Sequence, residues 1–303
     1  MMELIDKINK LKKERNAIIL AHTYQVGDIQ DIADFVGDSY GLSKKAADSD
    51  ADVIVFCGVH FMAETASIIA EDKTVLLPEI DAGCPMADMI DADKLRKMKE
   101  VDSDAIVVSY INSTAEVKAE TDVICTSSNV LKIVGNLKTN KIIFAPDKYM
   151  GSYVAAHYPE KEIILADGYC HVHVTILPED ILSLKEAHPS AVVLTHPECQ
   201  GEVVKLSDHI LSTSQMLDFA RESDAQEFII ATENGILYLL NKQNPQKKFY
   251  HASKYAVCPN MKKTTMEKLY WALEDMKYKI KVDKDIAVKA KRAIDNMFFY
   301  TEK

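Results

Sequence analysis

The sequence has no long apolar segment and no excess of basic residues. Its longest apolar run without a charge, residues 53–63, is about half of what a membrane-spanning helix needs. Thirty-six Lys and Arg residues stand against 46 Asp and Glu residues, which gives a net charge of −10 without a basic stripe. The charged N-terminal segment also lacks the apolar core of a signal peptide. We therefore expect a cytoplasmic protein with neither nucleic-acid nor membrane partners.

The six cysteines include no C-x-x-C pair, and no Gly/Ser-rich linker interrupts the chain. Spacing of this kind argues against a zinc ribbon or a thioredoxin-type motif, and a signal-free chain of this length is not typical of a disulfide framework. With 48% hydrophobic and 27% charged residues, the composition is that of an ordinary globular protein. A length of 303 residues exceeds what one core usually serves, so we expect two or three tightly packed units.

A pattern recurs three times along the chain with a period of 86 to 88 residues. Each copy begins with a short β-rich run that ends in a polar ring, at His22, Tyr110 and His196. Seventeen residues later each copy has a hydroxyl, at Ser39, Ser127 and Thr213. Two further apolar runs lead in each copy to a cysteine, at Cys84, Cys170 and Cys258. Since helical patterns separate the runs, the repeat predicts βαβ units with parallel sheets.

The fold class expected from this repeat is α/β, with three homologous three-layer, parallel-sheet domains around a pseudo-threefold axis and a central active site. We expect the domains at residues 1–104, 105–189 and 190–270. An amphipathic helix over residues 1–15 precedes them, and a final helix is expected over residues 283–300. The C-terminal residues 271–303 are expected to pack back on the first domain.

The repeat divides the cysteines into two groups. Cys57, Cys125 and Cys199 have no cysteine at the equivalent positions of the other copies, and we expect them to be structural. Cys84, Cys170 and Cys258 occupy equivalent loops, which a threefold arrangement would bring together, although common ancestry alone could also explain them. Three thiolates suit a closed zinc site poorly, whereas an iron–sulfur cluster held by three would keep one iron open as a Lewis acid.

The hydroxyl residues Ser39, Ser127 and Thr213 each stand at the start of a helical pattern. A hydroxyl there is expected to cap its helix, and three inward-pointing helix starts would also attract a small, multiply anionic ligand.

Three polar pairs with i, i+2 spacing stand at the ends of the equivalent first strands. In an extended chain such pairs face the same side. They are His22 with Tyr24, Tyr110 with Asn112, and His196 with Glu198. Glu198 is the sole carboxylate among them and therefore the natural general acid or base. His173, three residues after Cys170, is expected beside the cysteines.

The chain resembles the quinolinate synthase family, in its shorter form, over essentially its full length. The resemblance is carried by the segments AHTYQ (21–25), DIADFVGDS (31–39), FMAET (61–65), GCPMA (83–87), YINST (110–114), TSSN (126–129), GYCHVH (168–173), HPEC (196–199), STSQM (212–216) and CPNMKK (258–263). It implies a triangular three-domain assembly and a 4Fe-4S cluster with the ligands Cys84, Cys170 and Cys258. It also implies a substrate pocket of His22, Ser39, Tyr110, Ile111, Asn112, Ser127, His196, Pro197, Glu198 and Thr213. Tyr24 and His173 are implied to assist, and the implied catalytic set is Glu198, Tyr24, Tyr110, His22, His173 and His196.

The reaction implied by this resemblance is a transferase-type condensation in NAD biosynthesis. Iminoaspartate and dihydroxyacetone phosphate would give quinolinate with loss of phosphate and water, and an aspartate-oxidising enzyme would act upstream. Thr23, His171 and Val174 differ from the residues that are common in the family. These differences affect the contacts expected around the site and leave the expected cluster ligands unchanged.

Two other functions are compatible with the residues. One is a zinc-dependent aldolase or hydrolase that uses His22, His173 and His196. The other is a non-enzymatic iron–sulfur redox sensor, which would favour exposed cysteines and a partner-binding segment. Iron, sulfide and zinc analysis would distinguish the three.

Overall fold

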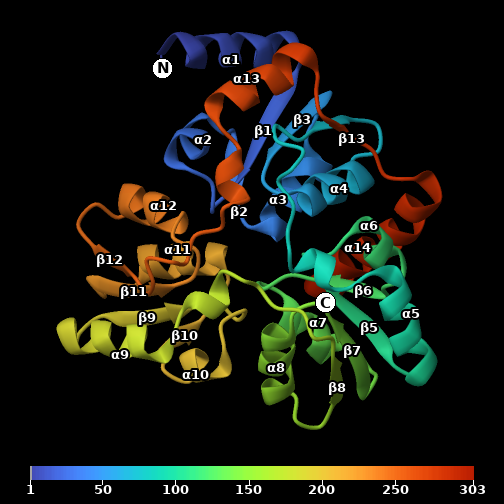
Figure 1. The fold of residues 1–303 in the computed structure, drawn as a ribbon, viewed down its shortest axis with the longest axis vertical. Helices are drawn as coiled ribbons and strands as arrows, with labels where there is room; N and C mark the ends of the chain where they lie inside the picture. Colours follow the sequence, from blue (N-terminus) through green and yellow to red (C-terminus); the bar gives the residue numbers. More distant parts are fainter. Residues whose placement is uncertain (1) are drawn as a thin grey trace.

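Three α/β units are arranged as a triangle in the computed structural model, which describes residues 2–303 (Figure 1). Each unit contains four parallel strands in the same order, in which the first strand lies between the second and the third and the fourth follows the third; in the first unit a fifth, antiparallel strand lies beyond the fourth. The alignment of the first strand with the third is also the same, because Ala17 pairs with Val53, Ile106 with Ile142, and Val192 with Phe228, each 36 residues apart. The predicted fold class of three repeated α/β units is confirmed.

The elements follow the same sequence in every unit. In the first they are β1 (Ala17–His22), α2 (Gly27–Ile32), β2 (Phe35–Gly37), α3 (Ser39–Asp48), β3 (Val53–Cys57), α4 (His60–Ile69) and β4 (Thr74–Leu76), preceded by α1 (Met2–Glu14) and followed by η1 (Ala87–Met89) and α5 (Ala92–Val101). In the second they are β5 (Ile106–Tyr110), α6 (Ala115–Ala119), β6 (Val123–Cys125), α7 (Val130–Asn136), β7 (Lys141–Ala145), α8 (Lys148–His157), β8 (Glu162–Leu165), η2 (His173–Thr175) and α9 (Pro178–Ala187). In the third they are β9 (Val192–Thr195), α10 (Gly201–Val204), β10 (His209–Ile210), α11 (Thr213–Glu222), β11 (Glu227–Ala231), α12 (Ile236–Gln243), β12 (Lys248–His251), η3 (Met261–Lys263) and α13 (Met266–Asp275).

Helices cover both faces of each sheet, so the strands are buried on both sides and their sequences are short continuous apolar runs. All five residues of β3 are buried, as are the last four of β1, β5 and β7. Helix starts are fixed by capping side chains, including Asp38 for α3, Thr265 for α13 and Ser212 for α11, where Gln215 completes a capping box. The predicted N-terminal helix is present as α1, whose Ile8 and Leu11 are buried; Met1 lies outside the described residues.

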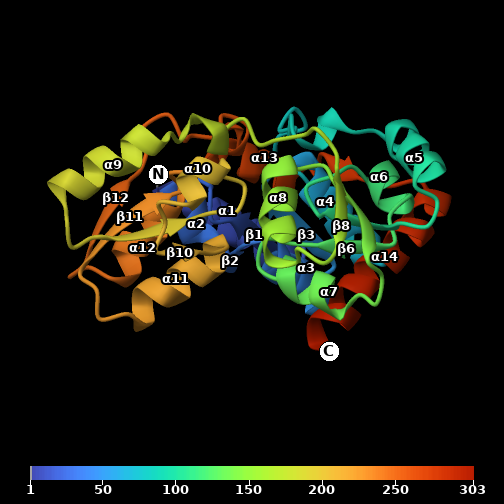
Figure 2. The same ribbon diagram turned by 90° about the horizontal axis from the view of Figure 1, so that it is seen from below.

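The C-terminal segment only partly packs where the sequence led us to expect it. Strand β13 (Lys279–Ile280) does extend the first sheet, antiparallel to β4. The final helix, α14 (Lys284–Glu302), instead lies mainly against α6, β6 and α7 of the second unit, with a smaller contact to α4 (Figure 2). Its apolar stripe of Ala290, Ala293, Ile294 and Met297 is buried in the core of that unit. Asn296 adds a hydrogen bond to the Asp122 carbonyl at 2.9 Å.

The triangle leaves the carboxyl ends of the three sheets facing its centre (Figure 1). We propose the domains 1–104 and 105–189, since both boundaries fall between two sheets, whereas the expected end of the third domain, 190–270, falls inside α13. Within residues 2–303, no helix is both long and apolar enough to cross a lipid bilayer.

Candidate functional site

A central cavity lies where the carboxyl ends of the three sheets meet. Ligand sites of open parallel sheets lie at this end, beside the point where the strand order reverses. In each unit that point is between the first and third strands, which places His22, Tyr110 and His196 on the cavity wall. Including the part open to solvent, the cavity has a volume of about 710 Å³.

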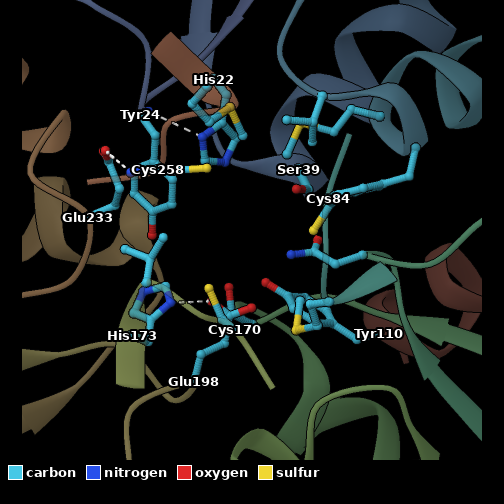
Figure 3. Close-up of a pocket in the computed structure, with 18 of the residues that line it drawn as sticks. His22, Tyr24, Ser39, Cys84, Tyr110, Cys170, His173, Glu198, Glu233 and Cys258 are labelled. Atoms are coloured by element: carbon cyan, nitrogen blue, oxygen red, sulfur yellow. Dashed lines mark hydrogen bonds and ion pairs between the residues drawn. The ribbon is translucent and has the colours of Figure 1, made fainter. Parts of the chain in front are cut away.

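Three cysteines enter this cavity from three sides (Figure 3). Each lies three residues before a short 3-10 helix: Cys84 before η1, Cys170 before η2 and Cys258 before η3. None of them forms a disulfide. The repeat therefore predicted correctly that these three loops converge. The other three cysteines, Cys57, Cys125 and Cys199, are buried in apolar cores.

The surroundings of the three thiols suit metal-bound thiolates. Burial raises the pKa of Cys84 to about 12 and raises those of Cys170 and Cys258 as well. In all three loops the backbone N–H groups two and three residues further on oppose this rise, because they donate to the sulfur. Desolvated thiols with prearranged N–H donors are expected to ionise when a metal replaces their protons. The donor set thus fits a cofactor held by three thiolates.

The three predicted hydroxyls line the cavity, but they do not cap their helices. Asp38 accepts from the Gly41 N–H and caps α3, and Ser212 accepts from the Gln215 N–H and caps α11. Ser39 and Thr213 are consequently the first residues inside their helices. Ser127 lies in the turn before α7. The cap prediction was wrong by one residue in two units, and the effect is to leave these hydroxyls available to the cavity.

His22 is oriented by its own backbone. Its Nδ1 accepts a hydrogen bond from the Tyr24 N–H at 3.2 Å, so the neutral ring carries its proton on Nε2. The corresponding contact in the third unit, from the Glu198 N–H to His196 Nδ1, is 3.4 Å. Burial lowers the pKa of His22 to about 3 and also lowers that of His196. The predicted i, i+2 pairing thus reflects a local turn that fixes the ring.

Glu198 lies at the centre of a buried polar network (Figure 3). Its Oε2 is 2.8 Å from His173 Nδ1 and 3.3 Å from His196 Nδ1, while Oε1 has no hydrogen-bond partner among residues 2–303. Burial alone would raise the pKa of Glu198, but the two imidazoles beside its Oε2 outweigh burial and hold the pKa below its ordinary value. Glu198 is therefore an ionised carboxylate with one free oxygen.

Thr232 extends this network to the first unit. Its hydroxyl lies 2.8 Å from His173 Nε2 and 2.6 Å from the Tyr24 hydroxyl. With the His173 proton on Nδ1, facing Glu198, the Thr232 hydroxyl donates to Nε2 and accepts from Tyr24. A single threonine thus connects a tyrosine of the first unit to the carboxylate of the third.

The second unit contributes uncharged groups. Burial, with the charge of Glu198 adding to it, raises the pKa of Tyr110 well above its ordinary value, so its hydroxyl is a neutral donor. The same causes raise the pKa of Tyr24. Asn112 lines the cavity, and its buried Oδ1 has no hydrogen-bond partner among residues 2–303. These groups can orient a bound molecule without adding charge.

Most of the predicted site residues come together in this cavity. The exceptions are Ile111 and Pro197, which are buried behind the wall rather than on it. Several further wall or network residues were missed by the sequence; the polar ones include Asp38, Thr126, Thr232 and Glu233, of which the last two follow β11. The repeat gave no signal for Thr232, because the equivalent positions hold Gly58 and Pro146; for Glu233 it gave a partial one, since the second unit has the carboxylate Asp147 at the matching position.

One trio within residues 2–303 has ligand atoms close enough for a single metal ion, and it consists of Cys170, His173 and Glu198, within 4.8 Å of one another. It is not the trio of His22, His173 and His196 expected for a zinc enzyme. The rings of His173 and His196 stack with centroids 4.8 Å apart, and Thr232 already engages His173 Nε2. The geometry therefore does not favour that zinc site.

Fold and cavity together define a three-unit α/β protein whose units share one central site with three cysteines. Comparison with known proteins identifies its family: the sequence model of "Quinolinate synthetase A protein" matches residues 6–299. The chain is 55% identical over 291 residues to a quinolinate synthase of Caldicellulosiruptor saccharolyticus, covering 96% of both chains. It is 54% identical over 293 residues to one of Thermodesulfovibrio yellowstonii, with 97% of both chains covered. A relative from Dehalococcoides mccartyi is 54% identical over 300 residues, 99% of both chains. The chain belongs to the quinolinate synthase A family.

Proposed function

We propose that this protein is a quinolinate synthase that condenses iminoaspartate with dihydroxyacetone phosphate, releasing phosphate and two waters, in NAD biosynthesis. The observation that carries the proposal is the convergence of three cysteine loops on one cavity with Glu198, in a chain of this family. Since iminoaspartate is an oxidation product of aspartate, an aspartate-oxidising enzyme would have to supply it.

Cys84, Cys170 and Cys258 would hold a 4Fe-4S cluster. When bound, such a cluster supplies one iron without a protein ligand, which acts as a Lewis acid toward a substrate oxygen or nitrogen. The fit rests on the N–H donors that face each sulfur and on the absence of disulfides among the six cysteines.

Substrate binding would depend on neutral donors at the cavity wall. Ser39, Ser127 and Thr213 each lie at or just before the start of a helix, where hydroxyl and backbone N–H groups favour carboxylate or phosphate oxygens. His22, held with its proton on Nε2, and Asn112 add further hydrogen-bonding groups. A site of this kind binds anionic substrates without a lysine or arginine on its wall.

Proton transfer would centre on Glu198. As an ionised carboxylate with Oε1 unpartnered, it can take a proton from a substrate carbon and return it elsewhere. Tyr24 and Tyr110 remain protonated: Tyr110 can donate to an oxygen that leaves as water or phosphate, and Tyr24 can do so when its hydroxyl hydrogen turns from Thr232 to the substrate. His173 and Thr232 would keep Tyr24 and Glu198 in fixed relative positions.

The test is anaerobic purification followed by iron, sulfide and zinc analysis, and then an assay of quinolinate formation from the two substrates. We expect about four irons per chain, together with quinolinate formation that is lost in Cys84→Ser. Zinc in place of iron, or a cluster-loaded protein that makes no quinolinate, would refute the proposal; the latter result is the one expected of a redox sensor.

A further inference from the structure

Glu233 is a fully buried carboxylate on the cavity wall that the proposed chemistry does not use (Figure 3). Its Oε1 accepts a hydrogen bond from the Cys258 N–H at 2.9 Å, and its Oε2 accepts from the Gly235 N–H at 2.7 Å. Lys262 Nζ lies 2.9 Å from Oε1 and 3.2 Å from Oε2. Because chain donors occupy both oxygens, this carboxylate is suited to holding backbone rather than to exchanging protons with a substrate.

Lys262 carries this contact across the boundary between two units. It lies in η3 of the third unit, and its Nζ also donates to the backbone carbonyl of Tyr24 in the first unit. One ion pair therefore connects the N–H of Cys258 with the carbonyl of Tyr24. The first of these residues is a proposed cluster ligand and the second a proposed proton donor.

The surrounding backbone is packed closely around this pair. A Cβ atom at Gly235 would lie 2.7 Å from both Lys262 Nζ and the Tyr24 carbonyl oxygen, so only glycine fits. Gln30 Nε2 strengthens the same boundary, because it reaches the carbonyls of Thr23, Gln25 and Gly235 at 3.0, 2.8 and 3.1 Å. The Glu233–Lys262 pair is thus part of a tight polar boundary, with little freedom to move.

The other two units lack an equivalent ion pair. Asp147 stands at the matching position of the second unit, where Oδ1 caps α8 through the Met150 N–H at 2.8 Å and Oδ2 has no partner among residues 2–303. The first unit has the apolar Val59 at this position. A buried carboxylate that faces the backbone N–H of the cysteine is thus shared with the second unit, where Asp147 faces the Cys170 N–H, and what is specific to the third unit is the lysine that pairs with this carboxylate and reaches Tyr24.

We propose that Glu233 and Lys262 are positioning residues that fix Cys258 and Tyr24 relative to each other across the boundary of the third and first units. The roles of those two residues rest on the proposed function, whereas the mechanical coupling does not. Removing one partner of a buried ion pair leaves an uncompensated charge, so single substitutions should loosen the side that has lost its donor or acceptor.

Three variants of the full chain separate the two halves of this coupling. Glu233→Gln replaces one acceptor oxygen with an N–H₂ group that faces N–H donors, which frees the Cys258 loop. Lys262→Met keeps the carboxylate on the Cys258 N–H but removes the bond to Tyr24. Lys268→Met is the matched control, because Lys268 pairs with Glu79 across the same two units without contacting the cavity wall.

The first measurement needs no cluster and no substrate. Reduced, cluster-free protein is treated anaerobically with N-ethylmaleimide, and the labelling rate of each cysteine is followed by peptide mass spectrometry. We expect Glu233→Gln to raise the rate at Cys258 about fivefold or more through local opening, with Cys84 and Cys170 unchanged. An unchanged Cys258 rate, an equal rise at all three cysteines, or the same rise in Lys268→Met would overturn the coupling.

The second measurement uses the cluster-loaded enzyme. Lys262→Met should keep the wild-type iron content and KM but lose about tenfold or more in kcat, because Tyr24 is no longer held in its orientation. A wild-type kcat in Lys262→Met would overturn the proposal. If Glu233→Gln does not fold, the kcat of Lys262→Met is the measurement that decides. If the wild-type protein itself forms no quinolinate, the proposed function fails, and the labelling rates still decide the coupling.

Discussion

Replacing Thr232 with valine removes one hydroxyl from the centre of the site and keeps the shape of the side chain. That hydroxyl is hydrogen-bonded to both the Tyr24 hydroxyl, at 2.6 Å, and His173 Nε2, at 2.8 Å. Thr232 and His173 are each only 1% exposed, and Tyr24 is 9% exposed. The substitution therefore leaves two buried polar groups without their shared partner.

The expected magnitude follows from those two groups. An unsatisfied buried donor or acceptor costs about 1–3 kcal/mol. Because the adjoining cavity can admit water to one of the two, we expect a loss of about 2–4 kcal/mol in the free energy of unfolding. Tyr24 and His173 also lose their fixed orientation, and a loss of about 1.4–2.8 kcal/mol of transition-state stabilisation corresponds to a 10- to 100-fold lower kcat.

The assay combines urea unfolding of the cluster-free protein with quinolinate formation by the loaded enzyme. Thr232→Ser is the matched control, since it keeps the hydroxyl and should retain most of both quantities. If Thr232→Val equals the wild type in stability and kcat, the hydroxyl does not connect Tyr24 to His173 and the proposed network is refuted. Equal losses in the valine and serine variants would refute it too, because the methyl group, and not the hydroxyl, would then matter.

Three other predictions address the metal, the pH dependence and the core. Cys84→Ser should lose the visible absorption of the iron–sulfur cluster while keeping the far-ultraviolet circular dichroism of the wild type; an intact cluster would exclude Cys84 as a ligand. The pKa of His22 is lowered by burial to about 3, so the unfolded chain binds one more proton between that value and the ordinary one. Stability should therefore fall as the pH drops from about 6.5 toward 3, by up to about 1.4 kcal/mol per pH unit from this ring. Urea unfolding of His22→Gln across that range should show a shallower slope, and an identical slope would be a contradiction. Ile294→Ala should cost about 2–5 kcal/mol in unfolding free energy, because Ile294 is fully buried against the second unit; a loss below about 1 kcal/mol would mean that α14 contributes little there.

The shared features of the repeat could be predicted from the sequence because its three copies have the same spacing and therefore the same geometry. His22 and Tyr110 end the first strand of their units and His196 directly follows that of the third, and a common strand order brings all three strand ends to one centre. The cysteine loops converge for the same reason. The spacing of the repeat was therefore sufficient to predict that the three strand ends and the three cysteine loops meet at one centre.

Features that depend on competition between neighbours could not be predicted in the same way. Asp38 and Ser212 cap their helices in place of Ser39 and Thr213, since any of these side chains can accept a hydrogen bond and only the turn geometry decides. For α14, the apolar stripe indicates a buried face without indicating which unit covers it. That choice depends on the surface that the second unit offers.

The residues that make the cavity chemically useful are those in which the three copies differ. At the second position of the i, i+2 pairs, the units hold Tyr24, Asn112 and Glu198. A carboxylate in every copy would place three like charges in one desolvated cavity, and their repulsion would raise the pKa values until at least one was protonated. Glu198 is the one carboxylate at these three positions. Asp38 and Glu233 also line the cavity, but Asp38 caps α3 and Glu233 is paired with Lys262, which leaves Glu198, beside His173 and His196, as the base in the proposed reaction. The repeat thus brings the groups together, and the departures from it place a single carboxylate among the three i, i+2 pairs.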